Sequence, residues 1–277
     1  MESVFTESRA GNAITPRWFT EMVKSQQRVI VTAGGSGIGR AIVDQFVDSG
    51  ARVHICDVQP DLISEITEKN TMVTGTLADV GNPPDVEKLV SEAIAEMGGV
   101  DVLVNNAGIG GPRGAIEDIS YEDWDRTINV NLNGMFYCIK NVAPHMKAQD
   151  SGCIINISTA SAKVALPMRS PYVASKVGVL GLTHTVAREY GPFGIRCNSI
   201  LPGLINNERG RGIVANQAKE RSITTEEREA EFLEFISLKC WIDPSEVGDL
   251  AVFLASQAGR HITGQDIGMD GNVEWEI

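Results

Sequence analysis

Short, almost uninterrupted apolar runs alternate with segments of helical periodicity from residue 28 onwards. Runs of this kind suit parallel strands, because helices then cover both faces of the sheet. The strand runs are RVIVTA (28–33), ARVHIC (51–56), DVLVNN (101–106), CIINIS (153–158) and IRCNSI (195–200), with TMVTGTL (71–77) a weaker member. The helical segments are 38–49, 84–97, 121–148 and 171–190. This alternation predicts an α/β fold with three layers, α/β/α, around a doubly wound parallel sheet with right-handed crossovers.

Length and charge limit the classes of protein that this chain can represent. Its 277 residues suit one large α/β domain, which we assign to residues 28–277. Residues 1–27 form an N-terminal extension, which is either an arm on the body or a frayed terminus. The 24 basic and 36 acidic residues give a formal charge of -12, which repels phosphate backbones and anionic lipids. We therefore expect neither nucleic acid nor a membrane as a partner.

The cysteines and the N-terminal residues indicate the compartment. Five cysteines are scattered without a CxxC pair, which favours apolar free thiols over disulfides or a metal site. The first 27 residues lack the basic patch and apolar stretch of a secretory signal. We expect a cytoplasmic protein without a bound metal.

One polar segment interrupts the alternation of strands and helices. Residues 203–240 are helix-prone and lie between two strand signals. An insertion there stands above the carboxyl edge of the sheet, where ligands bind in this architecture. The segment is interpreted as a substrate lid, and the alternative is a helical excursion that only thickens the surface.

A glycine-rich turn, GGSGIG (34–39), follows the first strand and opens a helix. Bare backbone N–H groups and a positive helix end at such a turn suit a dinucleotide pyrophosphate. Asp57 ends the next strand, 18 residues past Gly39, which is the spacing of the acidic residue that binds the adenosine ribose hydroxyls. The pattern predicts a Rossmann nucleotide site.

The charge of Asp57 also predicts which dinucleotide binds. Its carboxylate would repel the extra phosphate of NADP, and Ser36, Val58 and Gln59 bring no compensating cation. NAD is therefore the predicted cofactor. Asp79, after the following strand, is assigned a hydrogen bond to the adenine amino group, although a turn-forming aspartate explains that residue nearly as well.

Tyr172 and Lys176 lie four residues apart on the predicted helix 171–190, so both project from one face. An ordinary phenol is a poor base at neutral pH. A nearby ammonium and the positive nicotinamide ring of an oxidised cofactor favour the phenolate. Tyr172 is therefore a candidate acid/base for a substrate alcohol, although this pair also occurs on ordinary helices.

Three further motifs accompany the tyrosine and the lysine. They are NNAGIGG (105–111) after a strand, NVNLNGMFY (129–137) within a helical segment, and LPG (201–203) after the strand that ends at residue 200. Together with the glycine turn, they make the chain resemble the short-chain dehydrogenase/reductase family in its form with one Rossmann domain. The resemblance covers residues 28–271.

The resemblance implies a role for each matching residue. Asn131 corresponds to an asparagine that holds a water, Tyr172 to the general acid/base, and Lys176 to the residue that binds the nicotinamide ribose and acidifies the tyrosine. Asn105 and its NNAG neighbours support the adenine side, and the family implies a homo-oligomer, either a tetramer or a dimer. The full cofactor set is Ala33, Gly34, Ser36, Gly37, Ile38, Gly39, Asp57, Val58, Asp79, Val80, Asn106, Ala107, Gly108, Tyr172, Lys176, Pro202, Gly203 and Ile205.

Two departures from the family pattern fall among the predicted site residues. Ala33 replaces the first glycine of the usual TGxxxGxG, and we expect its methyl group to be tolerated because only a positive φ would make it costly. The catalytic serine of the family corresponds to Thr159, 13 residues before Tyr172. Ser158 is one residue away, and in a strand that step turns a side chain to the opposite face. Thr159 is therefore the predicted catalytic hydroxyl, which completes the set with Asn131, Tyr172 and Lys176.

The predicted function is NAD-dependent interconversion of a secondary alcohol and a ketone. The substrate is a polar or anionic small molecule such as a sugar, a polyol or a hydroxy acid, because Arg113, Arg169, Arg209 and Arg211 fall in segments expected to line the pocket. The alternative for these four residues is a solvated surface. The competing functions are a 3-oxoacyl-thioester reductase, which Asp57 disfavours, and a NAD-sensing protein without turnover.

Overall fold

A seven-stranded sheet runs through residues 26–274, which the computed structural model describes. The strands are β1 (Arg28–Thr32), β2 (Arg52–Asp57), β3 (Val73–Leu77), β4 (Val102–Asn105), β5 (Gly152–Ile157), β6 (Ile195–Pro202) and β7 (Asp266–Met269). Every neighbouring pair is parallel, in the order β3-β2-β1-β4-β5-β6-β7. The order reverses between β1 and β4, so the sheet is doubly wound as predicted. In this architecture the crevice that binds ligands lies at the carboxyl ends of such strands.

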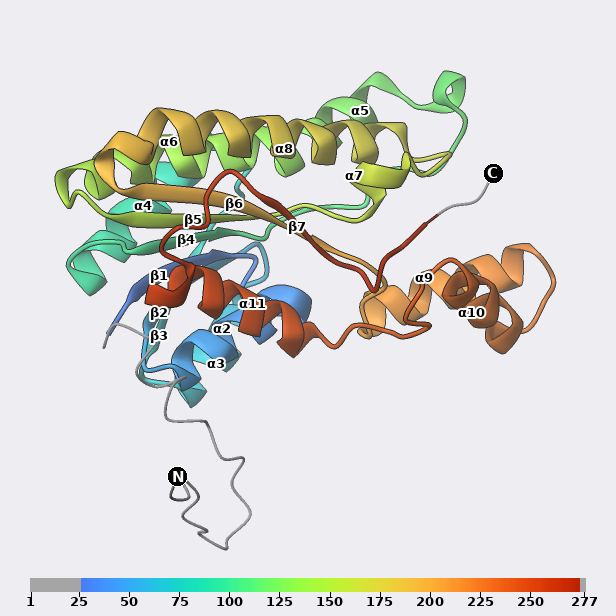
Figure 1. The fold of residues 1–277 in the computed structure, drawn as a ribbon, viewed down its shortest axis with the longest axis horizontal. Coiled ribbons are helices and arrows are strands. Elements are labelled where there is room, and N and C mark those ends of the chain that lie inside the picture. The colour runs from blue at the N-terminus through green and yellow to red at the C-terminus, as the bar shows by residue number, and fades with distance from the viewer. Residues whose placement is uncertain (1–25, 275–277) are drawn as a thin grey trace, which may run out of the picture.

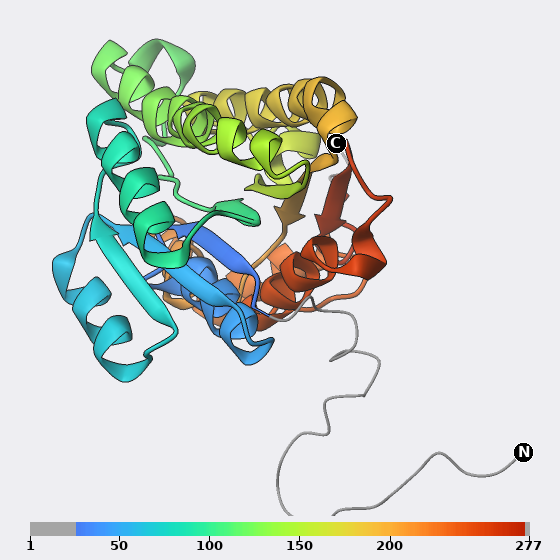
Figure 2. The ribbon, with the colours of Figure 1, turned by 90° about the vertical axis from the view of Figure 1, so that its left-hand side faces the viewer.

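Helices cover both faces of the sheet in three layers (Figures 1 and 2). On one face lie α4 (Pro83–Met97), α5 (Tyr121–Ile128), α6 (Gly134–Ala148) and α8 (Ser170–Tyr190), and on the other α2 (Gly37–Asp48), α3 (Pro60–Lys69) and α11 (Pro244–Ala255). The short α7 (Ser161–Val164) follows β5. Within residues 26–274, no helix combines the length and apolar character that a membrane crossing requires.

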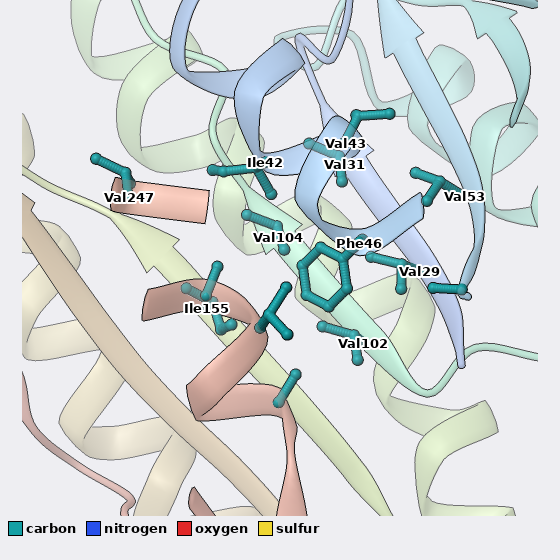
Figure 3. Close-up of a cluster of buried hydrophobic side chains, with 14 of the residues drawn as sticks. Val29, Val31, Ile42, Val43, Phe46, Val53, Val102, Val104, Ile155 and Val247 are labelled. Atoms are coloured by element: carbon teal, nitrogen blue, oxygen red, sulfur yellow. The ribbon is translucent and has the colours of Figure 1, made fainter. Parts of the chain in front are cut away.

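The alternation of side chains along the strands divides the core in two. Val29 and Val31 of β1 pack with Phe46 of α2 and with α11, as Figure 3 shows, whereas Ile30 faces α4 and α6. All four side chains are fully buried. Apolar side chains thus project from both faces of the central strands. This explains why apolar and polar residues do not alternate along these strands in the sequence.

The predicted strands match the structure to within about three residues at each end. The predicted helix 121–148 is interrupted, because a π-helical turn (Asn129–Asn133) separates α5 from α6. Periodicity had indicated neither α3, nor α11, nor the short β7.

The segment after β6 contains α9 (Glu208–Glu220) and α10 (Thr225–Glu234), so its prediction as a helical insertion is confirmed. Both helices stand away from the sandwich, past the end of β6 (Figure 1). The side chain of Asn207 caps α9, and Thr224 with Glu227 forms a capping box on α10. The predicted N-terminal extension, except its last two residues, lies outside the described residues.

Candidate active site

The glycine loop leads from β1 into α2. Gly34 donates its N–H to the carbonyl of Cys56 at 3.1 Å, which ties the loop to β2. Gly37 has φ +56°, and a Cβ at Gly39 would lie only 2.0 Å from the carbonyl oxygen of Ala33. The backbone therefore requires glycine at Gly39 and favours it at Gly37.

Ala33 does not behave as the sequence predicted. Its φ is +50°, in the left-handed region that disfavours a side chain. The expectation that its methyl group is tolerated without strain is wrong. This conformation lets the Ala33 carbonyl accept a hydrogen bond from Asn106 Nδ2 at 3.1 Å. A glycine at this position would adopt the same turn at a lower cost.

Asp57 lies at the carboxyl end of β2 with 6% of its surface exposed. One carboxylate oxygen accepts from the N–H of Gly35 at 3.3 Å, and the other accepts from Gln59 at 3.2 Å. A Cβ built on Gly37 would meet only Asn207 Nδ2, at 3.7 Å, so the loop is open there. An open glycine cradle beside an oriented carboxylate fits a dinucleotide.

The NNAG segment braces this loop. Thr32 Oγ1 accepts from the N–H groups of Asn106 and Ala107 at 2.9 and 3.0 Å, and Asn106 Nδ2 also donates to the Thr32 carbonyl at 3.0 Å. Asn105 is buried and donates to Asn156 Oδ1 at 2.9 Å, which links β4 to β5. The carboxyl ends of β1 and β4 are therefore held together by side chains.

Asp79 and Val80 lie just past β3. One oxygen of Asp79 accepts from the N–H of Gly81 at 2.8 Å, which is the turn-forming arrangement. Asp79 is otherwise exposed, and the side chain of Val80 is buried against Gly134 of α6. Both residues border the crevice from the β3 side.

The π-helical turn fixes Asn131. Its amide oxygen accepts from the N–H of Ile109 at 2.8 Å, and its Nδ2 donates to the Ile109 carbonyl and the Ser175 hydroxyl at 3.0 Å each. Ser175 in turn donates to the carbonyl of Tyr172 at 2.7 Å. Asn131 thus connects the loop after β4 to the turn of α8 that carries Tyr172.

Lys176 is buried on α8 with 3% of its surface exposed. Its Nζ donates to the carbonyl of Ile157, at the end of β5, at 2.7 Å. A Cβ on Gly108 would lie 3.3 Å from both Lys176 Nζ and Asn131 Oδ1, so these two side chains converge there. Burial, with a smaller effect of Arg209, lowers the pKa of Lys176 to about 7.

The two hydroxyls after β5 are distinguished by hydrogen bonding. The strand ends at Ile157, and Ser158 Oγ donates to the carbonyl of Lys176 at 3.0 Å. The prediction that strand alternation turns Ser158 away from α8 is therefore wrong. Thr159 Oγ1 accepts from the N–H of Ser161 at 3.3 Å. Ser158 is thus committed to the backbone of α8, whereas the Thr159 hydroxyl keeps its proton for another acceptor.

Tyr172 lies in the first turn of α8, after Pro171. The guanidinium carbon of Arg169 is 5.0 Å from the centre of its ring. Burial lowers the pKa of Arg169, Tyr172 opposes this, and Arg209 and Arg113 add to it. A guanidinium stays charged under such perturbation. The tyrosine therefore lies next to a fixed positive charge.

The residues after β6 border the crevice from the other side. Pro202 ends β6, Gly203 donates its N–H to the Met269 carbonyl at 2.9 Å, and Ile205 is buried and pairs with Ile242. A Cβ on Gly210 would come within 2.1 Å of the Ile205 carbonyl, so the first turn of α9 requires glycine at this position.

Sequence reasoning missed Thr32, Ser175 and Asn207. The Thr32 hydroxyl accepts hydrogen bonds from two backbone N–H groups. Ser175 links Asn131 to the backbone of Tyr172. The side chain of Asn207 lies next to Gly37 of the glycine loop. The available signal for Ser175 was its position on the same helix face as Tyr172.

Comparisons with known proteins agree with this geometry. A family model described as enoyl-(acyl carrier protein) reductase matches residues 32–273. A probable galactose dehydrogenase of Rhizobium meliloti is 38% identical, covering 88% of this chain and 94% of the relative, and the D-β-hydroxybutyrate dehydrogenase of the same organism is 37% identical, covering 87% and 96%. A 3-oxoacyl-[acyl-carrier-protein] reductase of Staphylococcus epidermidis is 33% identical, covering 88% and 97%.

A solved structure shares the fold as well. A variant of the actinorhodin polyketide ketoreductase, solved with NADPH, has a TM-score of 0.84 and 28% identity, covering 89% of this chain and 96% of that one. The sheet, the glycine loop and these relatives define an oxidoreductase that binds a nicotinamide cofactor. The chain belongs to the short-chain dehydrogenase/reductase family.

Proposed function

We propose that this protein is an NAD(H)-dependent oxidoreductase that interconverts a secondary alcohol and a ketone in a polar small molecule. The observation that carries the proposal is the convergence of Asn131 and Lys176 on Gly108, with Tyr172 joined to Asn131 through Ser175. This cluster stands at the carboxyl ends of β4 and β5, beside the glycine loop. The names of the galactose and hydroxybutyrate dehydrogenases support alcohol and ketone chemistry.

In this proposal the chain's own residues handle the proton. Thr159 hydrogen-bonds the reacting oxygen, and Tyr172 takes the alcohol proton in oxidation or gives it back in reduction. Lys176 stabilises the phenolate, and Asn131 holds the loop after β4 in place. The cofactor, when bound, accepts or supplies the hydride, which balances the conversion of the C–OH group to C=O.

NAD is favoured over NADP by Asp57. The carboxylate is oriented by two backbone N–H groups, so it cannot turn away from a ribose without losing both hydrogen bonds. An extra phosphate at that ribose would meet this negative charge. The glycine loop, Asp57, Asp79 and the NNAG segment are the proposed cofactor contacts, with Pro202, Gly203 and Ile205 at the nicotinamide end.

A 3-oxoacyl-thioester reductase is the second candidate, which the Staphylococcus relative and the family model favour. Asp57 argues against it if such an enzyme is to use NADPH. A NAD-sensing protein without turnover is the third possibility, against which the complete set of Thr159, Tyr172 and Lys176 argues. These functions differ in cofactor, in substrate and in the presence of turnover.

A substrate panel with a matched pair of variants tests the proposal. Polyols, sugars, hydroxy acids and an acetoacetyl thioester are assayed with NAD(H) and NADP(H) by absorbance of the reduced nicotinamide. We expect turnover of an alcohol with NAD, lost by at least about 100-fold in Tyr172→Phe, and unchanged in Tyr121→Phe, which alters an exposed ring. Preference for the thioester with NADPH would favour the second candidate, and tight NAD binding without turnover would favour the sensor.

Several broader features belong to the same proposal. Residues 28–277 act as one catalytic domain with α9 and α10 as its substrate lid, in a cytoplasmic protein. Membership of the family supports a homo-oligomer, either a tetramer or a dimer. Light scattering in solution would measure the oligomeric state, and a monomer would contradict it.

A further inference from the structure

Two arginines from different segments meet at the loop after β4. Arg169, just before α8, donates from Nη2 to the carbonyl of Gly110 at 2.7 Å, and Arg209 of α9 donates from Nη1 to the carbonyl of Gly108 at 3.5 Å. A Cβ built on Gly110 would lie 3.1 Å from Arg169 Nη2 and 3.2 Å from Arg209 Nη2. The two guanidinium groups therefore converge on one backbone position.

The four arginines that the sequence analysis places near the pocket differ in their ion pairs: two have a carboxylate partner and two do not. Arg113 pairs with Glu220 at 3.3 Å, and Arg211 pairs with Glu229 at 3.0 Å while its guanidinium stacks on Trp241. Among residues 26–274, neither Arg169 nor Arg209 has a carboxylate within 4.0 Å. Although the chain has 36 acidic residues, its described part thus leaves two adjacent cations without a counterion.

Arg169 has an unused hydrogen-bond donor at this position. Its Nε is buried and, within the described part of the chain, has no hydrogen-bond partner. A buried donor without an acceptor is destabilising, and so is the repulsion between two guanidinium groups. A carboxylate between the two guanidinium groups would remove their repulsion, and a small shift of the Arg169 side chain would let it accept from Nε as well.

We propose that Arg169 and Arg209 bind the carboxylate of the substrate, so that the enzyme acts on short hydroxy acids and the matching oxo acids. This inference rests on the proposed function. Arg169 lies over the ring of Tyr172, so the carboxylate lies within a few bonds of the carbon whose oxygen Tyr172 serves. A 2- or 3-hydroxy acid has that length, whereas a neutral sugar offers no anion to this pair.

The test compares charged and neutral forms of one substrate. Initial rates with NAD are measured for 2- and 3-hydroxybutanoate and for their methyl esters, using wild type, Arg169→Gln, Arg209→Gln and the control Arg260→Gln. We expect kcat/KM for an acid to fall by about 10- to 100-fold in the first two variants, with little change for the ester. The control, which alters an exposed arginine after α11 that donates to the carbonyl of Gln257, should match wild type for both.

A binding measurement separates this inference from the proposed function. The Tm of the NAD complex, which has no hydride to give to a ketone, is recorded with 3-oxobutanoate and with its methyl ester. We expect the acid alone to raise the Tm in wild type and in Tyr172→Phe, but not in Arg169→Gln or Arg209→Gln. If no hydroxy acid or other alcohol is turned over with NAD, the proposed function fails, whereas an equal response to acid and ester overturns only the carboxylate site.

The pyrophosphate of the cofactor is the other anion that Arg169 and Arg209 could bind. The dissociation constant of NADH, measured by protein fluorescence, distinguishes the two sources. We expect it to stay within about threefold of wild type in both arginine variants, since each would lose contacts to the substrate alone. A larger loss of NADH affinity in both variants would assign the pair to the cofactor and overturn the proposal.

Discussion

Polar side chains hydrogen-bond to the surrounding backbone on the side of the crevice proposed for the cofactor. Thr32, Asn106 and Asp57 all bind backbone groups of neighbouring loops. On the side proposed for the substrate, the Thr159 hydroxyl proton and Arg169 Nε have no protein acceptor among residues 26–274. The first side is preorganised by the chain itself, and the second offers donors that a ligand must satisfy.

Left-handed backbone conformations of residues other than glycine occur on both sides of the crevice. The loop between α7 and α8 holds Ala165 and Met168 at φ +49° and +62°, and the lid holds Ser222 and Lys239 at +56° and +49°. Left-handed conformations of residues other than glycine are unfavourable, so these segments store energy that a different arrangement would release. On the cofactor side, Ala33 is the corresponding strained residue.

The largest expected effect lies on the substrate side, at the two adjacent hydroxyls. Thr159→Ala removes a donor to the reacting oxygen, and we expect kcat to fall by about 100- to 1,000-fold with the NAD dissociation constant unchanged. Thr159→Ser keeps the hydroxyl and should retain or raise activity. Steady-state kinetics with the best substrate measure both.

Ser158→Ala is the matched control for this pair. Because its hydroxyl donates to the carbonyl of Lys176, its loss should lower the free energy of unfolding by about 1 kcal/mol and change kcat little. If Ser158→Ala lowers kcat more than Thr159→Ala does, the assignment of the catalytic hydroxyl is wrong.

On the cofactor side, Asp57→Asn keeps the shape of the side chain and removes its charge. We expect kcat/KM for NAD to fall by about 10-fold and that for NADP to rise, because repulsion of the extra phosphate is lost. Asp61→Asn, an exposed change of the same charge on α3, should alter neither. If the ratio of kcat/KM for NADP to kcat/KM for NAD is the same in Asp57→Asn as in wild type, a feature other than the Asp57 charge sets the cofactor preference.

The fold around the proposed cofactor site could be predicted from the sequence because its signals are local. A strand, a glycine turn and an aspartate at a fixed spacing specify each other along the chain, so the positions of Gly39 at the start of α2 and of Asp57 at the end of β2 agree with the prediction. The left-handed conformation of Ala33 could not be predicted. It places the Ala33 carbonyl where Asn106 donates to it, and nothing in the sequence around an alanine indicates that contact. Sequence shows the residue but not the direction of its backbone.

The substrate side could be predicted only in part, because its contacts join distant segments. The four arginines were identified as one group, and only the fold shows that Glu220 and Glu229 neutralise two of them. The Ser158 assignment failed because strand alternation was applied beyond Ile157, where β5 ends. The π-helical turn at Asn131 has no periodic signature of its own.

Lys176 is a buried cation without a carboxylate partner among residues 26–274. Burial lowers its pKa to about 7, compared with the ordinary 10.5, so the folded protein binds fewer protons than the unfolded chain between these values. The free energy of unfolding therefore rises with pH in that window, by up to about 1.4 kcal/mol per pH unit. Urea unfolding of wild type and Lys176→Met at pH 7, 8 and 9 measures it.

The expected result for Lys176 is a difference between the two proteins that changes with pH. Wild type should gain stability relative to Lys176→Met as the pH rises, because the penalty for a buried ammonium is fully present only below about pH 7. Groups common to both proteins cancel in this difference. A constant difference from pH 7 to 9 would contradict the lowered pKa.

The smallest expected effect tests the strained residue of the cofactor side. Ala33→Gly removes a Cβ at φ +50°, and we expect the free energy of unfolding to rise by about 0.5 to 1 kcal/mol. The gain is smaller than the full strain because glycine loses more conformational freedom on folding. Ala95→Gly, at an exposed position inside α4, should destabilise by about 1 kcal/mol. The same substitution thus has opposite signs at two sites, and a loss of stability at both would mean that the Ala33 methyl group contributes packing that outweighs its backbone strain.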